Sequence, residues 1–233
     1  MGLGERLIEE LGVKTIFSIG GIAITESILN TWILIAVFFL VCLLATRKLK
    51  VENPGRGQLL LESFVEWIQK LAKGMLGEGA ASYAPFICTI LIFIAMVNLC
   101  ALFETRITHE FTFMKPPTKD LNIPIALGLV SIVVVEAAGI IGKGVKGWLK
   151  SFTQPMAAIT PINVLELFIK PLSLCMRLFG NIFGAYIIME LLKILVPLIL
   201  PIPFSFYFEI FDGLIQAYVF VFLTSIYIQE AVE

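Results

Sequence analysis

Charged residues are scarce in this chain of 233 residues, and neither sign is in excess. Asp, Glu, Lys and Arg make up 15% of the sequence, and the formal net charge is −1. Soluble domains carry about 25% charged residues, so we do not expect a soluble globular enzyme. The balanced charge argues against nucleic acid as the main partner. Because 58% of the residues are hydrophobic, the composition indicates an integral membrane protein.

Cysteine and the motifs of catalytic sites are equally sparse. The sequence contains no phosphate-binding P-loop, no metal-ligand cluster and no nucleophile–base pair. We therefore expect a non-catalytic protein without a metal or cofactor. Residues 1–27 contain several charges around a short apolar run, so no cleavable signal peptide is evident. The four cysteines lie inside apolar segments without a C-x-x-C pair: Cys42, Cys88, Cys100 and Cys175.

Three stretches are long enough and apolar enough to cross a membrane. A spanning helix needs about 20 mostly apolar residues. Residues 27–46 and 79–103 contain no charge, and residues 121–142 contain only Glu136. Each of the three stretches predicts a transmembrane helix.

Residues 57–75 have an amphipathic pattern. Apolar residues recur at spacings of three and four, and charged residues fill the other side. This pattern predicts a helix that lies at the membrane surface. The charged side consists of Glu62, Glu66, Lys70 and Lys73.

The remainder of the chain is apolar but carries ionisable residues. A cluster of prolines after residue 196 divides it into two long helices, residues 162–196 and 204–229. The first is longer than an upright span requires, so it must tilt, kink near Pro171 or extend outside the bilayer. The sequence predicts one membrane domain, residues 1–233. Its class is an all-α polytopic membrane protein with five transmembrane helices, the last two long and tilted, plus one amphipathic interfacial helix.

The distribution of Lys and Arg predicts the orientation. With alternate loops placed on opposite sides, one side collects ten basic residues and the other side six. The side with more Lys and Arg usually faces the cytoplasm. We therefore expect the N-terminus outside and the C-terminus in the cytoplasm.

Polar residues form a stripe along the first long helix. Glu166, Lys170, Ser173, Arg177 and Asn181 follow one another at spacings of three or four, so they share one helix face. A charge near the middle of a bilayer costs at least about 2.5–3.5 kcal/mol, and Arg177 lies near the centre of the run. We therefore expect Arg177 to have either a functional or a structural role.

The final helix carries a second stripe, formed by Glu209, Asp212 and Gln216. Two polar faces around one buried arginine indicate aqueous approaches through the membrane. The alternative is that Arg177 forms a structural ion pair with Glu136 or Glu209 and fixes the helix packing.

Three segments resemble one known family. Residues 170–184, KPLSLCMRLFGNIFG, look like the signature of subunit a of F-type ATP synthases, the stationary ion-channel subunit of the membrane motor. Residues 214–228, LIQAYVFVFLTSIYI, resemble the family's last helix, and residues 117–129 resemble its stretch entering the fourth helix. The order of spans also matches, from about residue 28 to the C-terminus.

The resemblance implies a function beside a ring of c subunits, together with subunit b of the peripheral stalk and membrane lipids. Two offset half-channels would conduct H⁺ or Na⁺ to and from the ring carboxylates in a bacterial cell membrane. Arg177 matches the essential arginine that attracts an ionised ring carboxylate and prevents an ion leak. The resemblance assigns further polar positions near the arginine to Gln216, Asn181 and Ser173.

Other residues match the two half-channels. Glu166 matches an acid on the cytoplasmic approach, the inner half-channel. The outer half-channel is assigned to Glu190, Glu209, Asp212, Asp120 and Asn122. The sequence departs from the family at Tyr186, where many relatives carry Glu or His, and Glu190 on the same face could substitute. Glu136 could line an aqueous pocket or pair within the bundle.

Two other functions fit the same buried charges. A free-standing cation-coupled secondary transporter would use them without partners, but the chain has no inverted repeat. A structural membrane subunit would use its polar stripes to hold helices together. The sequence does not distinguish H⁺ from Na⁺.

Overall fold

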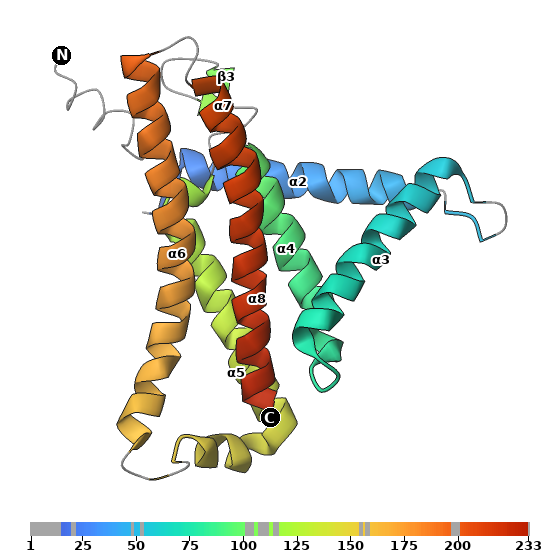
Figure 1. Ribbon diagram of the computed structural model, residues 1–233, viewed down its shortest axis with the longest axis vertical. Coiled ribbons are helices and arrows are strands. Elements are labelled where there is room, and N and C mark those ends of the chain that lie inside the picture. The colour runs from blue at the N-terminus through green and yellow to red at the C-terminus, as the bar shows by residue number, and fades with distance from the viewer. Residues whose placement is uncertain are drawn as a thin grey trace.

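Helices dominate the computed structural model, which describes residues 15–19, 22–47, 49–51, 54–100, 105–106, 112–113, 117–153, 156, 159–196 and 201–232. Four helices form an elongated bundle, and two more project from it to one side (Figure 1). The bundle helices are α4 (Ala84–Leu99), α5 (Asn122–Ser151), α6 (Thr160–Leu195) and α8 (Gly213–Val232). The predicted all-α polytopic class is confirmed, with five helices long and apolar enough to cross a membrane.

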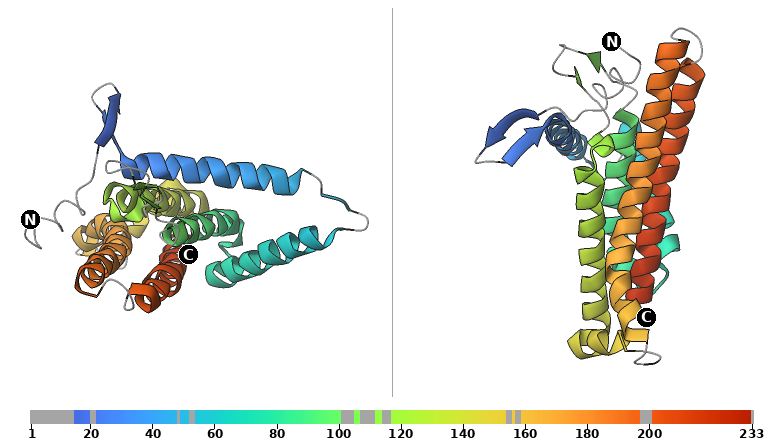
Figure 2. Two further views of the ribbon diagram at one scale, coloured as in Figure 1. Left: turned by 90° about the horizontal axis from the view of Figure 1, so that it is seen from above. Right: turned by 90° about the vertical axis from the view of Figure 1, so that its left-hand side faces the viewer.

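Helix α2 (Glu26–Thr46) crosses the bundle at a steep angle, as both views in Figure 2 show. Thr25 caps it by accepting a hydrogen bond from the backbone N–H of Ile28. Only its first part is buried, and large apolar side chains such as Phe39 and Leu44 are exposed beyond it. Its 21 residues measure about 31 Å at a rise of about 1.5 Å each, which matches the thickness of the hydrocarbon core.

Helix α3 (Arg56–Leu76) is the predicted amphipathic helix. Ile68, Ala72 and Leu76 are buried and pack toward α4, whereas Glu66 and Lys70 form an exposed ion pair at 2.9 Å. The helix ends at Gly77, whose φ of 66° lies in the left-handed region that favours glycine.

Helix α8 is the centre of the bundle, because it contacts α3, α4, α5 and α6. The residues it buries are mostly small, including Ala217, Val221 and Thr224. Small side chains let membrane helices approach closely. The bundle core is therefore built around α8.

Helix α6 continues through Pro171 as one helix of 36 residues. At about 1.5 Å per residue it measures about 54 Å, well over the roughly 30 Å of a hydrocarbon core. A helix of this length must tilt strongly in a bilayer or extend beyond it. Gly128 of α5 sits against it, where an added Cβ would lie 2.9 Å from the carbonyl oxygen of Pro171.

Two features interrupt the regular helices. Within α5, Gly144 has φ 70° and ψ 160°, which turns the last residues of the helix away from its axis. The segment before α8 consists of a short helix, α7 (Pro201–Ser205), and a π-helical segment, η5 (Phe206–Asp212). Such wide turns occur frequently at functional sites.

Short elements connect the helices at the ends of the bundle. Antiparallel strands β1 (Thr15–Ile19) and β2 (Ile22–Thr25) form one hairpin, and β3 (Thr105–Arg106) pairs with β4 (Thr112–Phe113). Two 3₁₀ turns, η1 (Ala81–Tyr83) and η3 (Pro117–Lys119), precede α4 and α5. Residues 101–103 of the predicted span 79–103 lie outside the described residues.

Candidate functional site

Arg177 lies in the middle of α6 on its exposed side. Leu174, Cys175 and Leu178 beside it are buried, so the packed face of α6 points the other way. Among the residues that the structure describes, the guanidinium makes no hydrogen bond or ion pair. The pairing with Glu136 or Glu209 that the sequence left open is therefore not formed.

Asn181, one turn after Arg177, binds the segment before α8. Its side-chain Nδ2 donates to Oδ2 of Asp212 at 2.6 Å, which joins α6 to η5. At the end of α7, Ser205 Oγ donates to Oε2 of Glu209 on η5 at 2.7 Å. We call Ser205, Glu209, Asp212 and their partner Asn181 the acidic turn. Asp212 thus accepts from a neutral amide, and Glu209 accepts from a neutral hydroxyl.

The other residues of the two stripes occupy partly buried positions. Ser173 and Gln216 are half-buried, on α6 and α8. Tyr186 is 7% exposed and therefore packs inside the chain. Glu190 lies within α6, but its side chain is outside the described part of the structure.

A buried amide on α4 reaches the junction between the acidic turn and α8. Asn98 Nδ2 donates to the backbone oxygen of Gly213 at 2.9 Å, and Asn98 Oδ1 accepts from Thr118 Oγ1 at 3.2 Å. A Cβ on Gly213 would lie 3.1 Å from Cβ of Asn98, so glycine permits this approach. The sequence analysis missed Asn98, although a lone amide within an uncharged span was a usable signal.

Asp120 lies at the start of α5 and is only 3% exposed. Thr25 Oγ1 donates to its Oδ2 at 3.1 Å, and its Oδ1 accepts from the backbone N–H and the side-chain amide of Asn122. These bonds join the N-terminal end of α2 to the N-terminal end of α5. Asn122 itself is exposed.

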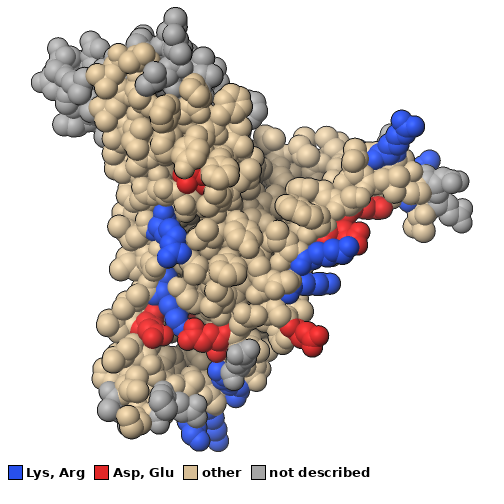
Figure 3. Space-filling view, viewed as in Figure 1, with Lys and Arg blue, Asp and Glu red and all other residues tan. Residues whose placement is uncertain are grey.

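A cavity of about 280 Å³ lies between α5, α6 and α8 at the end of the bundle that carries Lys143, Lys146 and Lys150. We call this the basic end, and the cavity the basic-end cavity. Figure 3 shows charged side chains gathered toward the lower ends of α6 and α8, and a second group along α3. The ionisable residues of the lining are Glu136, Lys143, Glu166, Lys170 and Glu230.

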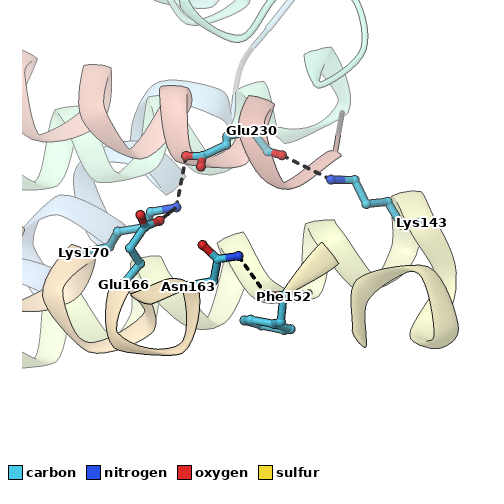
Figure 4. Close-up of polar contacts among 6 residues, drawn as sticks. All are labelled: Lys143, Phe152, Asn163, Glu166, Lys170 and Glu230. Atoms are coloured by element: carbon cyan, nitrogen blue, oxygen red, sulfur yellow. Dashed lines mark hydrogen bonds and ion pairs between the residues drawn. The ribbon is translucent and has the colours of Figure 1, made fainter. Parts of the chain in front are cut away.

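Lys170 holds together two of these carboxylates (Figure 4). Its Nζ lies 3.0 Å from Oε2 of Glu230 on α8 and 3.4 Å from Oε2 of Glu166 on its own helix. It also lies 5.3 Å from the centre of the Tyr227 ring. Lys143 Nζ donates to the backbone oxygen of Glu230 at 3.3 Å. The end of α8 is thereby attached to both α5 and α6.

Glu136 accepts a hydrogen bond from a tryptophan, whereas Glu166 and Glu230 pair with Lys170. Oε2 of Glu136 accepts this bond at 2.7 Å from Nε1 of Trp148, which follows the turn at Gly144. Nearby, Asn163 Nδ2 donates to the backbone oxygen of Phe152 at 2.9 Å and closes the connection to α6. Trp148 and Glu230 were not among the predicted site residues, because neither falls in a polar stripe.

The structure thus separates the predicted site residues into groups. Asn181, Glu209 and Asp212 lie together next to the turn of Arg177, Asp120 and Asn122 lie at the start of α5, and Glu136 and Glu166 line the basic-end cavity. Along α6, Arg177 therefore lies between Asn181 with its acidic partner Asp212 and the carboxylates of the basic-end cavity. Within the described ranges no group of three or more His, Cys, Asp or Glu side chains could hold a metal ion.

Comparison with known proteins gives one consistent result. The sequence model of the family described as ATP synthase A chain matches residues 28–229. ATP synthase subunit a of Moorella thermoacetica is 36% identical over 218 residues, which cover 94% of this chain and 95% of the relative. ATP synthase subunit a 2 of a Bradyrhizobium species is 34% identical over 217 residues, 93% of each chain.

Proposed function

This chain belongs to the ATP synthase A chain family, and from that premise we propose that it conducts H⁺ or Na⁺ to and from the carboxylates of a c-ring. It is an integral membrane protein with five helices long enough and apolar enough to span a membrane. It would stand still in the membrane, held by subunit b of the peripheral stalk and surrounded by lipid. Ion flow through it would turn the ring and drive ATP synthesis, with the nucleotide chemistry in other subunits.

The observation that carries this proposal is the exposed, unpaired Arg177. A guanidinium in the middle of a spanning helix is expensive in lipid, and such residues pair with another group or face water. No described residue of the chain pairs with it, which supports a partner in another molecule. An ionised ring carboxylate fits, because at an effective dielectric constant of about 20 a contact at 4 Å is worth about 4 kcal/mol.

The two carboxylate groups supply the two half-channels in this proposal. The outer half-channel would use the acidic turn, with Glu190, Asp120 and Asn122 nearer the surface. Gln216 and Ser173 line the approach to Arg177. The inner half-channel would open through the basic-end cavity beside Glu166. The lysines at that end support a cytoplasmic location for it in a bacterial cell, with the N-terminus outside. The chain needs no cofactor or resident metal for this work.

The test is ion flux in liposomes that contain the complete complex. We expect Arg177→Ala to assemble, to lose at least about 90% of ATP-driven ion uptake, and to leak ions when ATP is absent, because no fixed charge separates the half-channels. Arg177→Lys, the matched control, keeps the charge but not the bidentate geometry and retains part of the uptake. Uptake is recorded in H⁺ and in Na⁺ media, which identifies the ion.

Normal pumping by an assembled Arg177→Ala complex would contradict the proposal. A free-standing transporter is the competing function. It would move ions when the purified chain alone is reconstituted, and we expect no such flux without the c-ring.

A further inference from the structure

Glu136 is the only charged residue inside the apolar part of α5, and the proposed function leaves it without a role. It is half-buried and lines the basic-end cavity. Ionisable residues inside spanning helices are rare and mark ion pathways or internal pairs. Its single partner among the residues with described contacts is Trp148.

Two glycines build the contact between Glu136 and Trp148. In a straight helix, residues 136 and 148 would lie about 18 Å apart along the axis. Gly144, with φ 70° and ψ 160°, turns the chain back, in a conformation that is essentially restricted to glycine. Gly139 makes room for the indole, since a Cβ there would lie 3.3 Å from Cδ1 of Trp148. The chain thus uses a kink and a missing side chain to bring one donor to one carboxylate.

The chemistry of Trp148 limits what it can do. An indole N–H is a donor only, so it orients Glu136 and cannot accept an ion from it. It occupies Oε2 and leaves Oε1 without a partner among the described contacts. By contrast, the other two carboxylates of the lining, Glu166 and Glu230, are both paired with Lys170. Glu136 is therefore the carboxylate of the cavity that has no lysine partner.

We infer that Glu136 is the carboxylate that exchanges ions with the water of the basic-end cavity, and that Trp148 is its positioning residue. This inference rests on the proposed function, in which the cavity is the inner half-channel. With H⁺ as the coupled ion, Oε1 of the carboxylate takes a proton from a hydronium ion and releases one water molecule, and the reverse step returns it. With Na⁺, Oε1 replaces one water ligand of the ion.

The first test measures ATP-driven uptake per assembled complex in inverted vesicles, across a series of cytoplasmic-side pH and Na⁺ values. Glu136→Gln is expected to lower the rate about tenfold and to remove one limb of the pH or Na⁺ profile. Trp148→Phe keeps the carboxylate and loses its hydrogen bond, so the rate falls about fivefold and the profile shifts. The exposed carboxylate of Glu62 provides the matched control, and Glu62→Gln leaves rate and profile unchanged.

A purely structural role would give a different result. Both variants would then reduce the amount of assembled complex, while the rate per complex and its ion dependence stayed as in the wild type. That outcome overturns the inference.

The second test asks whether water reaches position 136, whatever the coupled ion. In a chain with its four cysteines replaced by alanine, Glu136→Cys is treated with a charged, membrane-impermeant thiol reagent. Labelling from the cytoplasmic side only is expected. Val133→Cys, one turn earlier on the exposed side of α5, is expected to face lipid and to stay unlabelled. Labelling of position 136 from neither side, or from the opposite side, overturns the inference. This labelling does not depend on Arg177, so the inference and the proposed function can fail separately.

Discussion

The acidic turn and the basic-end cavity both hold carboxylates between α6 and the chain around α8, but with different partners. In the acidic turn, an amide donates to Asp212 and a hydroxyl donates to Glu209. In the basic-end cavity, Lys170 pairs with both Glu230 and Glu166. Neutral donors orient a carboxylate and leave its charge uncompensated, whereas a lysine compensates it.

This difference separates residues that can exchange cations from residues that hold helices together. A carboxylate with a neutral donor still attracts a cation. A carboxylate paired with a lysine can bind a cation only after the lysine has moved away. By this criterion Glu136, bound to an indole, resembles Asp212 of the acidic turn although it lies at the basic end. The four predictions below test the criterion, from the largest expected effect to the smallest.

The largest effect is expected for Asp212→Asn compared with Glu230→Gln. Both changes replace a carboxylate by an amide of the same shape, one in each region. Asp212→Asn should lower ATP-driven ion uptake at least about tenfold, because an uncompensated carboxylate is lost from the ion path. Glu230→Gln should change uptake less than about twofold, the scale of an exposed ion pair.

The measurement is uptake per assembled complex in liposomes, with assembly checked by co-purification of the c-ring. Equal losses in the two variants would mean that the partner of a carboxylate does not predict its role.

The second effect concerns the kink that shapes the basic-end cavity. Gly144→Ala places a side chain at φ 70° and ψ 160°, which costs about 2 kcal/mol. No atom lies within 4 Å of the new Cβ, so the cost is one of backbone conformation alone. We expect a lower midpoint of thermal inactivation of the purified complex.

Gly74 of α3 provides the control for Gly144, because its replacement is expected to change stability in the opposite direction. It too has open space around it, but it lies inside a regular helix, and Gly74→Ala should raise stability by up to about 1 kcal/mol. If both variants moved the midpoint in the same direction, the strain assigned to residue 144 would be refuted.

A smaller effect is expected for the ion pair that attaches α8 to α6. Lys170→Ala removes the partner of Glu230, whose side chain is 59% exposed, so solvent screens the interaction. The loss should be about 1 kcal/mol of stability. A double-mutant cycle with Glu230→Ala, read from thermal midpoints, gives the coupling between the two residues. A coupling of several kcal/mol would show that the pair is far less hydrated than its exposure indicates.

The smallest effect is expected at the exposed pair of Glu66 and Lys70 on α3. The hydrogen bond from Lys70, followed by its charge, lowers the pKa of the Glu66 carboxyl below its ordinary value of 4.5. A lowered pKa in the folded state stabilises the fold above pH 4.5, and this contribution is lost as the pH falls through the folded-state pKa. Lys70→Met should return the pKa toward 4.5, measured by NMR titration of labelled Glu, without a measurable change in the thermal midpoint. A clear fall in the midpoint would contradict the view that exposed pairs contribute little.

Some site residues were predictable because they lie within one helix. Ser173, Arg177 and Asn181 are separated by three or four residues, and a helix places such residues on one face whatever surrounds it. Trp148 could not be predicted as a partner of Glu136, because their contact depends on the turn at Gly144. The pairing of Lys170 with Glu230 joins residues 60 positions apart, which no local pattern indicates.

The π-helical segment η5 is a second feature that local spacing did not predict. Spacings of three and four predicted that Glu209, Asp212 and Gln216 share the face of one regular helix. The structure inserts η5 between α7 and α8, and the wider turn changes how Glu209 and Asp212 are placed relative to Gln216. Asn98, from another helix, binds the carbonyl oxygen of Gly213 at the point where the α-helix resumes.

The sequence by itself determined the membrane environment, the five spans, the amphipathic helix and the position of Arg177. These follow from composition and helical periodicity. A span requires about 20 apolar residues, and a charged residue inside a span is energetically costly and therefore easy to recognise in the sequence. Only the tertiary structure decided which partner each carboxylate has. Hydrogen bonds and ion pairs act over about 3 Å, so they depend on where kinks, wide turns and small residues bring separate helices together.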